Sequence, residues 1–168
     1  AAEVDDIVAV YDPEIRRRVI NSASSGLSVD ETQSAAIKDA YADKLLVGHV
    51  AALDIRQKGQ DVIVNVARDL EATHPDIHFL LVGGGEDEAV LRELASGLAN
   101  ISFSGFVKNV GDYLAAFDIF ILPSHKEGIG SVLLDAMEQR LPIVASRAGG
   151  VPEIVHDGFN GILIDRAQ

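Results

Sequence analysis

The chain has 168 residues, 48% of them hydrophobic and 24% charged, which suits one globular domain with an apolar core. The absence of cysteine excludes disulfides and thiolate metal ligands, and no apolar run approaches the roughly 20 residues that a membrane-spanning helix needs. The net charge of −12 argues against nucleic acid as a partner and against a broadly basic membrane-docking face. An anionic ligand would therefore have to be held by local groups.

Residues 1–43 differ from the rest of the chain because they have little sustained apolar pattern. A short helix is predicted at 13–20, and the remainder is predicted to be a linker with local structure, leading in from a preceding domain. Residues 1–6 are acidic where a signal peptide would be basic, which favours a cytoplasmic protein. The predicted domain comprises residues 44–168.

From residue 44 onward, short apolar runs alternate with amphipathic stretches. The apolar runs predict strands, at 45–50, 77–82, 101–103, 118–122, 143–146 and 161–164. The stretches with helical spacing predict helices, at 58–72, 87–95, 111–117 and 131–140, with a helical turn at 151–155. Nearly continuous apolar strands separated by helices are typical of a parallel sheet covered on both faces. The predicted fold class is therefore α/β, with a Rossmann-like, doubly wound sheet that binds ligands beyond the carboxyl ends of its strands.

The segment 122–137, with the sequence LPSHKEGIGSVLLDAM, predicts a strand end, a glycine turn and a helix start. The first N–H groups of a helix have no partner inside it, and its dipole favours negative charge. Gly128 and Gly130 would let a phosphate approach the backbone with no Cβ in the way. Glu127 and Asp135 flank this predicted anion site, one from the turn and the other from the start of the helix.

This segment resembles the E-x7-E region of retaining glycosyltransferases of the GT-B fold, especially glycosyltransferase family 4. The resemblance implies that the loop and helix start hold the diphosphate of a nucleotide-sugar, that Glu127 contacts the donor sugar, and that Asp135 contacts the ribose. Asp135 stands where the family has a second glutamate, so its carboxylate lies about 1.5 Å nearer the backbone. A small shift or a bridging water would preserve the ribose contact.

Lys58-Gly59 matches a second element of the family, in which a strand ending near Gly-Arg leads to Lys-Gly. The resemblance implies that Lys58 helps to neutralise the diphosphate. After Gly48, the family's arginine is replaced by His49, which gives less charge and cannot clamp two oxygens. From the residues alone, His49 is either a ligand contact or a filler of space, and Arg56 is a nearby cation that could substitute.

Three further stretches match the family. The glycines at 83–85 resemble a V-G-x-G element, and residues 104–107 resemble an F-x-G-x-V element whose backbone borders the nucleotide base. Residues 149–154 match a G-G-x-P-E-I element, although a tight turn followed by proline explains that sequence without any chemistry. The matches cover about 120 residues, 45–164, in the order that the family has them.

The resemblance implies the C-terminal, donor-binding domain of a nucleotide-sugar-dependent retaining glycosyltransferase, which transfers a hexosyl group to an acceptor hydroxyl in glycan, lipopolysaccharide or glycolipid synthesis. It implies no cofactor and no metal, with Glu127 and Lys58 as catalytic residues. A preceding domain would supply the acceptor site and any peripheral contact with the inner face of a membrane. The residues predicted to bind the donor are Gly48, His49, Lys58, Gly83, Val107, Glu127, Gly128, Ile129, Gly130, Ser131, Val132 and Asp135.

Two further expectations concern completeness: closing helices are predicted to be missing after residue 168, and the isolated chain is predicted to transfer no sugar. Two other kinds of protein stay open as alternatives. A sugar-nucleotide epimerase shares the architecture, and a non-catalytic nucleotide-sugar-binding or scaffold domain is suggested by the departures at His49 and Asp135.

Overall fold

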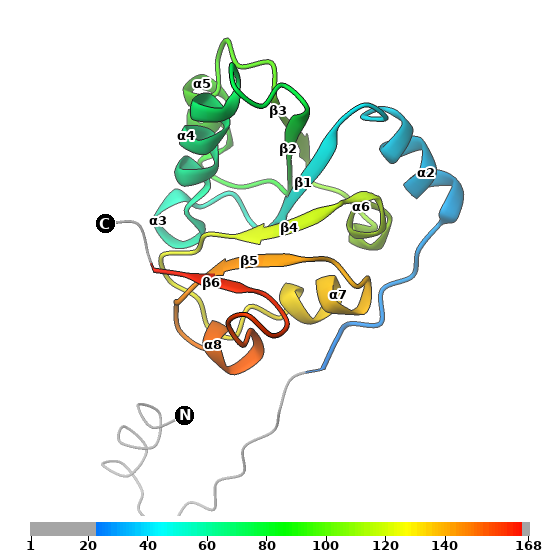
Figure 1. The fold of residues 1–168 in the computed structure, drawn as a ribbon, viewed down its shortest axis with the longest axis vertical. Coiled ribbons are helices and arrows are strands. Elements are labelled where there is room, and N and C mark those ends of the chain that lie inside the picture. The colour runs from blue at the N-terminus through cyan, green and yellow to red at the C-terminus, as the bar shows by residue number, and fades with distance from the viewer. Residues whose placement is uncertain (1–22, 166–168) are drawn as a thin grey trace, which may run out of the picture.

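A computed structural model describes residues 23–165, and the predicted helix at 13–20 lies outside them. The strands of the described part are β1 (Leu45–Val50), β2 (Ile77–Val82), β3 (Ile101–Gly105), β4 (Ile119–Leu122), β5 (Ile143–Ser146) and β6 (Ile162–Ile164). Its helices are α2 (Glu31–Asp39), α3 (Ile55–Lys58), α4 (Gln60–Leu70), α5 (Glu88–Leu94), α6 (Val110–Ala116), α7 (Val132–Glu138) and α8 (Val151–Ile154). Figure 1 shows how strands and helices alternate around one sheet.

All six strands of the described residues pair in parallel, in the order β3-β2-β1-β4-β5-β6. The chain first builds the sheet outward from β1 to β3, then returns to the other side of β1 and continues from β4 to β6. The strand order therefore reverses between β1 and β4, where Val47 is in register with Ile119. Ligands of such sheets bind outside the carboxyl ends of the strands at this point. The predicted fold class is confirmed.

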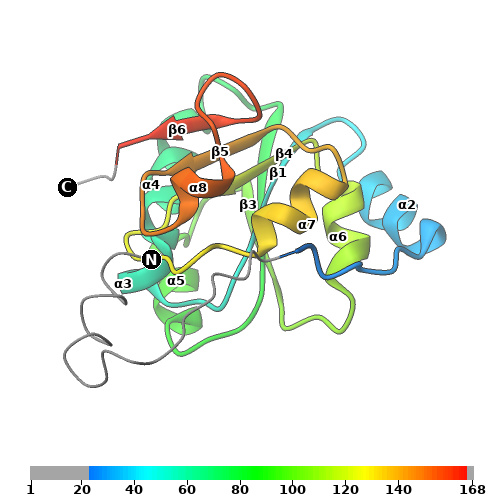
Figure 2. The same ribbon diagram turned by 90° about the horizontal axis from the view of Figure 1, so that it is seen from below.

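Two apolar cores lie on the two faces of the sheet, which explains why the strands read as continuous apolar runs. Neighbouring residues of β1 belong to different cores, Leu46 to one and Val47 to the other, because successive side chains of a strand point to opposite faces. Leu133 of α7 packs in the first core and Ile63 of α4 in the second. Figure 2 shows α4 and α5 on one side of the sheet and α6 and α7 on the other.

The helix predicted at 58–72 is in fact two helices, and this prediction was wrong at its start. Gly59 has the left-handed φ of 66° and ends α3 directly before α4 begins. A Cβ at Gly59 would lie 2.3 Å from the Pro123 carbonyl oxygen, so the site admits only glycine. Lys58 is therefore the last residue of α3, where a cation suits the helix dipole, and is not the first residue of a long helix.

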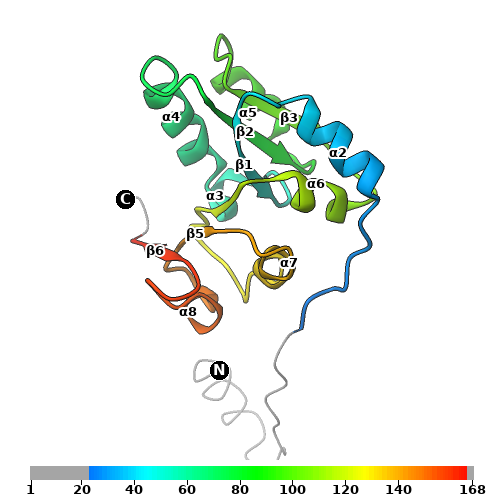
Figure 3. The same ribbon diagram turned by 45° about the vertical axis from the view of Figure 1, so that its right-hand side comes forward.

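The segment before β1 carries a helix, α2, in the stretch that was predicted to be a linker with local structure. Asp30 caps this helix by accepting hydrogen bonds from the Thr32 and Gln33 backbone N–H groups, and α2 packs against α6. Its exposed, weakly apolar sequence gave little periodicity, so the helix is stabilised by its cap and by this contact. Figure 3 shows the chain running from the region of α7 along α6 into α2. Among residues 23–165, no helix is long and apolar enough to cross a membrane.

Candidate functional site

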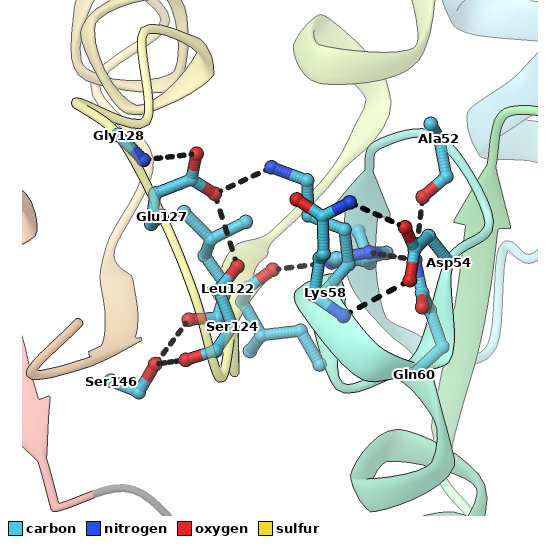
Figure 4. Close-up of polar contacts among 12 residues, drawn as sticks. Ala52, Asp54, Lys58, Gln60, Leu122, Ser124, Glu127, Gly128 and Ser146 are labelled. Carbon is cyan, nitrogen blue, oxygen red and sulfur yellow. Dashed lines mark hydrogen bonds and ion pairs between the residues drawn. The ribbon is translucent and has the colours of Figure 1, made fainter. Parts of the chain in front are cut away.

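An ion pair joins the two predicted catalytic residues at the carboxyl end of the sheet. Lys58 Nζ lies 2.7 Å from Glu127 Oε2, and the two side chains are 23% and 9% exposed. The Ser124 hydroxyl donates to the same Glu127 oxygen over 3.1 Å, and the Gly128 N–H donates to Oε1 over 3.2 Å. Figure 4 shows this carboxylate between Lys58 and its own loop. The structure thus brings Lys58 and Glu127 together across 69 positions of sequence.

Lys58 reaches Glu127 because the end of α3 is fixed to the loop after β4. The Gln57 carbonyl oxygen accepts the backbone N–H groups of His125 and Lys126, over 2.8 and 3.0 Å. Asp54 fixes the other end of α3, because its side chain accepts the Gln57 backbone N–H and side-chain amide. The close approach of Gly59 to Pro123 completes the contact. The two chain segments that carry the ion pair are therefore held in register by the backbone.

Beside the ion pair lies a row of unpaired backbone amides. Within residues 23–165, no acceptor is found for the N–H groups of Ile129, Gly130, Ser131 and Val132. Gly130 has φ 71°, and a Cβ there would lie 3.3 Å from Cγ of Glu127, so the amides and the Glu127 side chain are neighbours. Unpaired donors at a helix start attract anions, although α7 is short, with seven residues.

The glycine pair after β5 supports this loop and makes no contact that calls for chemistry. The Gly150 N–H donates to the Gly128 carbonyl over 2.6 Å, and a Cβ at Gly149 would lie 1.6 Å from the Glu127 carbonyl oxygen. The Ser146 hydroxyl donates to the Ser124 carbonyl. These contacts require glycine at 149 and hold the backbone of Glu127 and Gly128 in place. They agree with the structural interpretation of the G-G-x-P-E-I match.

A cavity of about 510 Å³ opens next to the amide row, between the ends of β1 and β2 and the start of α7. Five of the predicted donor-binding residues line it, namely Gly83, Val107, Ser131, Val132 and Asp135. The other residues of its wall are Ser25, Leu27, Val50, Ala51, Ala52, Gly84, Val82, Phe106 and Val110. Most of this wall is apolar, and its volume is typical of a pocket for a small organic ligand.

The acid at the far side of this cavity is bound by a residue that the sequence did not single out. Asp135 is 7% exposed, and its carboxylate accepts the Ser25 backbone N–H over 2.6 Å and the Ser25 hydroxyl over 3.1 Å. Ser25 stands 110 positions away in a polar stretch of the expected linker. No local pattern in the sequence connects the two residues, so only the fold reveals the contact.

Comparison with known proteins decides the family. Residues 44–168 match the family model described as "Glycosyl transferases group 1". The chain belongs to this family. It is 33% identical over 126 residues to the N-acetyl-alpha-D-glucosaminyl L-malate synthase of Bacillus anthracis, covering 73% of this chain and 32% of that protein. It is 35% identical over 111 residues to a GDP-mannose-dependent mannosyltransferase of Corynebacterium glutamicum, which acts on monoacylated alpha-(1-6)-phosphatidylinositol monomannoside, covering 60% of this chain and 29% of that protein.

Solved structures of similar proteins agree with this membership. Anabaena Alr3699/HepE, crystallised with UDP and glucose, superposes with a TM-score of 0.72 at 27% identity, covering 83% of this chain and 40% of that one. The C-terminal domain of a group 1 glycosyltransferase (LpcC) from Francisella tularensis shares the fold, with a TM-score of 0.70 at 24% identity, over 88% of this chain and 82% of that one. The chain spans about a third of the length of the curated relatives it matches.

Two predicted donor-binding residues of this group 1 glycosyltransferase chain have clear structural roles. A Cβ at Gly48 would lie 2.0 Å from the Phe117 ring, so glycine is required there for packing. His49 is fully buried, with Nδ1 3.0 Å from the Ile121 carbonyl and Nε2 3.3 Å from the Gln60 amide nitrogen. A carbonyl only accepts, so Nδ1 carries the proton and Nε2 accepts from Gln60. The donor contact predicted for both residues stays a prediction, and in this structure both nitrogens of the His49 ring already have protein partners.

The environment of His49 also keeps its ring uncharged. Burial lowers the pKa of His49 from 6.5 to about 4, a shift that the hydrogen bond to the Ile121 carbonyl opposes and the charge of Lys58 reinforces. The ring is neutral at physiological pH, so it does not replace the family's arginine as a cation. Residues 23–165 hold no group of three or more His, Asp or Glu placed to bind a metal ion, and the expectation that no metal is needed stays a prediction.

Proposed function

We propose that this chain is the donor-binding domain of a nucleotide-sugar-dependent, retaining glycosyltransferase of family 4 type, which transfers a hexosyl group to an acceptor hydroxyl in glycan, lipopolysaccharide or glycolipid synthesis. The observation that carries the proposal is the 510 Å³ cavity that meets a row of unpaired amides beside the Lys58–Glu127 pair. The similarity to Alr3699/HepE, whose crystals contain UDP and glucose, supports a nucleotide-sugar as the donor.

Each part of a nucleotide-sugar has a place of matching chemistry in this arrangement. The apolar cavity suits the nucleoside, whose base would lie against Val107 and the exposed Phe106. The amides of 129–132 and the ammonium of Lys58 suit the diphosphate. Glu127, at the end of the amide row, suits the hydroxyls of the sugar, because a carboxylate accepts hydrogen bonds from them. This order follows the order of groups in the ligand.

Catalysis would come from stabilising the departing diphosphate. Charge develops on the diphosphate oxygens as the bond to the sugar breaks, and fixed donors aimed at those oxygens stabilise the transition state. Lys58 supplies a full positive charge in this role. Its pairing with Glu127 keeps the ammonium in position, and a phosphate oxygen would share the ammonium with the carboxylate. Glu127 would then hold the sugar while the acceptor hydroxyl, brought by another domain, attacks.

Titration calorimetry with UDP, GDP and ADP tests the proposal on the 168-residue chain. We expect one of the three to bind, and we expect Lys58→Ala to weaken that diphosphate about tenfold or more, as loss of a charged hydrogen bond does. The same substitution should change binding of the corresponding nucleoside little. Lys44→Ala is the matched control, because it removes the same charge at the other end of β1. There the Lys44 ammonium donates to the Pro75 carbonyl. Absence of binding by all three nucleotides refutes the proposal.

A non-catalytic nucleotide-sugar-binding domain is the second candidate, and the neutral, buried His49 favours it. A site that lacks the arginine cation holds less positive charge for a leaving group. The two candidates differ in turnover by the full-length protein. Transfer of sugar to an acceptor identifies the enzyme, whereas tight nucleotide-sugar binding with no transfer to any acceptor identifies the binding domain.

A further inference from the structure

We propose that Ser25 is a positioning and specificity residue of the cavity: it fixes the Asp135 carboxylate, and together the two side chains form a row of acceptors that recognises a vicinal diol of the ligand. This inference rests on the proposed function, since the diol would be that of the ribose. It gives the segment before β1, predicted to be a linker with local structure, a part in ligand recognition.

The contact between the two residues uses both carboxylate oxygens. Asp135 Oδ1 accepts the Ser25 backbone N–H over 2.6 Å, and Oδ2 accepts the Ser25 hydroxyl over 3.1 Å. Both residues line the same cavity, and Asp135 is 7% exposed. Two hydrogen bonds to a nearly buried carboxylate fix the rotation of its side chain. The position of this charge therefore depends on Ser25.

The hydrogen-bonding capacity that remains is all of one kind. Because the Ser25 hydroxyl donates its hydrogen bond to Asp135, its oxygen can otherwise only accept, and each carboxylate oxygen also keeps a free acceptor site. The surrounding wall is mostly apolar, with Leu27, Val50 and Val107 among its members. A ligand that fills the cavity must therefore present hydrogen-bond donors at this end, and two adjacent hydroxyls provide a matching pair.

Ser25 is held at this place by contacts further along its own segment. The Asp30 backbone N–H donates to Asp112 of α6 over 2.7 Å. The Ser28 carbonyl lies so close to Gly111 that a Cβ there would be 2.2 Å away. Gly26, with φ 60°, turns the chain immediately after Ser25. The segment that leads into α2 thus lies along α6 (Figure 3). Ser25, at the start of this segment, lines the cavity.

The Ser25–Asp135 pair also compensates for the shorter side chain at position 135, where aspartate stands in place of the family's glutamate. An aspartate carboxylate lies about 1.5 Å nearer the backbone than that of a glutamate, so it reaches less far into the cavity. The Ser25 hydroxyl oxygen, which is hydrogen-bonded to that carboxylate and lines the same cavity, provides a further acceptor. Serine and aspartate together would cover the distance that a single longer acid covers, with no bridging water.

The experiment compares ribonucleotides with their 2′-deoxy forms by calorimetry on the 168-residue chain, using UDP, GDP and ADP and the matching 2′-deoxy diphosphates. The wild-type chain should prefer the ribose form. Ser25→Ala should weaken the ribose form about three- to tenfold, as loss of one hydrogen bond in a polar pair does, and weaken the deoxy form less, so that the preference shrinks. Ser25→Thr keeps the hydroxyl and should restore the preference. Ser24→Ala, one position away and outside the cavity wall, is the control and should change nothing.

Two results overturn the inference while leaving the proposed function intact. The first is an unchanged ribose preference in Ser25→Ala, which would reduce Ser25 to a structural contact. The second is tighter ribonucleotide binding in Ser25→Ala, which would mean that Ser25 competes with the ribose for Asp135. If the wild-type chain binds none of the nucleotides, the proposed function fails and this inference fails with it.

Discussion

Replacement of Lys58 by methionine tests whether its pairing with Glu127 exists in solution. Methionine keeps the length of the side chain and removes the charge. At 2.7 Å and an effective dielectric constant of 20, the attraction between the charges is about 6 kcal/mol. Desolvation of two partly buried ions offsets most of this, since Lys58 and Glu127 keep only 23% and 9% of their side-chain exposure. We therefore expect Lys58→Met to lower the free energy of unfolding by about 1–3 kcal/mol.

The two single substitutions should lower the free energy of unfolding by different amounts. Lys58→Met leaves the carboxylate of Glu127 nearly buried with only the Ser124 hydroxyl and the Gly128 N–H as donors. Glu127→Gln leaves an ammonium that is more exposed and can turn to water, so it should cost less. The double variant should recover part of the loss, because removing both partners leaves no uncompensated charge.

Urea unfolding of the wild type, both single variants and the double variant gives the coupling free energy of the pair. We expect about 1–3 kcal/mol, equivalent to about 2–4 °C in Tm for each kcal/mol in a chain of this size. Lys44→Met is the control for the change in net charge and should shift stability by less than about 0.5 kcal/mol. A coupling indistinguishable from zero refutes the reasoning, because the ion pair that positions Lys58 beside the amide row would then be absent in solution.

Three more predictions concern the backbone and the buried histidine. Gly48→Ala should lower the free energy of unfolding by about 1–3 kcal/mol through its clash with the Phe117 ring, and Phe117→Leu in the same chain should recover part of this loss in urea unfolding. Gly59→Ala should destabilise the chain by a similar amount, because it forces a left-handed residue against the Pro123 carbonyl, and it should also weaken nucleotide binding in calorimetry by displacing the end of α3. His49 has a pKa of about 4 when folded, against 6.5 in the unfolded chain, so the unfolded chain binds the extra proton between these values. Its neutral ring therefore contributes fully to the free energy of unfolding above pH 6.5. This contribution falls by about 3 kcal/mol as the pH drops towards 4. The stability difference between wild type and His49→Gln, measured by urea unfolding across this range, should shrink accordingly, and a constant difference would contradict the burial argument.

The sequence predicted those features that depend on neighbours along the chain. Apolar runs are a sufficient signal for the strands of a parallel sheet, because such strands are buried on both faces whatever the order of pairing. The loop after β4 was likewise predictable, since turn, glycines and acid lie within a few residues. Gly59 shows where the same reasoning failed: the helical spacing continues across it, and the break follows from the Pro123 carbonyl of a distant loop.

His49 shows a second limit, which concerns the direction of a side chain. Its position in the sequence suggests a residue near the ligand, and its type permits a charge. The register of β1 between β2 and β4 instead turns the ring inward, where the Ile121 carbonyl and Gln60 bind both nitrogens. Pattern alone does not distinguish a residue that ends a strand at the cleft from one that stands a single position earlier, because that one position reverses the face.

The two ends of the candidate site differ in how much of each could be predicted from the sequence. The proposed phosphate end is formed by one loop and by Lys58, and both were found as short motifs. The proposed nucleoside end needs the contact of Ser25 with Asp135 across 110 positions, and that contact depends on the docking of the segment before β1 along α6. If Ser25→Ala changes the ribose preference while Lys58→Ala changes affinity for the diphosphate and spares the nucleoside, the two ends act independently, as their separate construction implies.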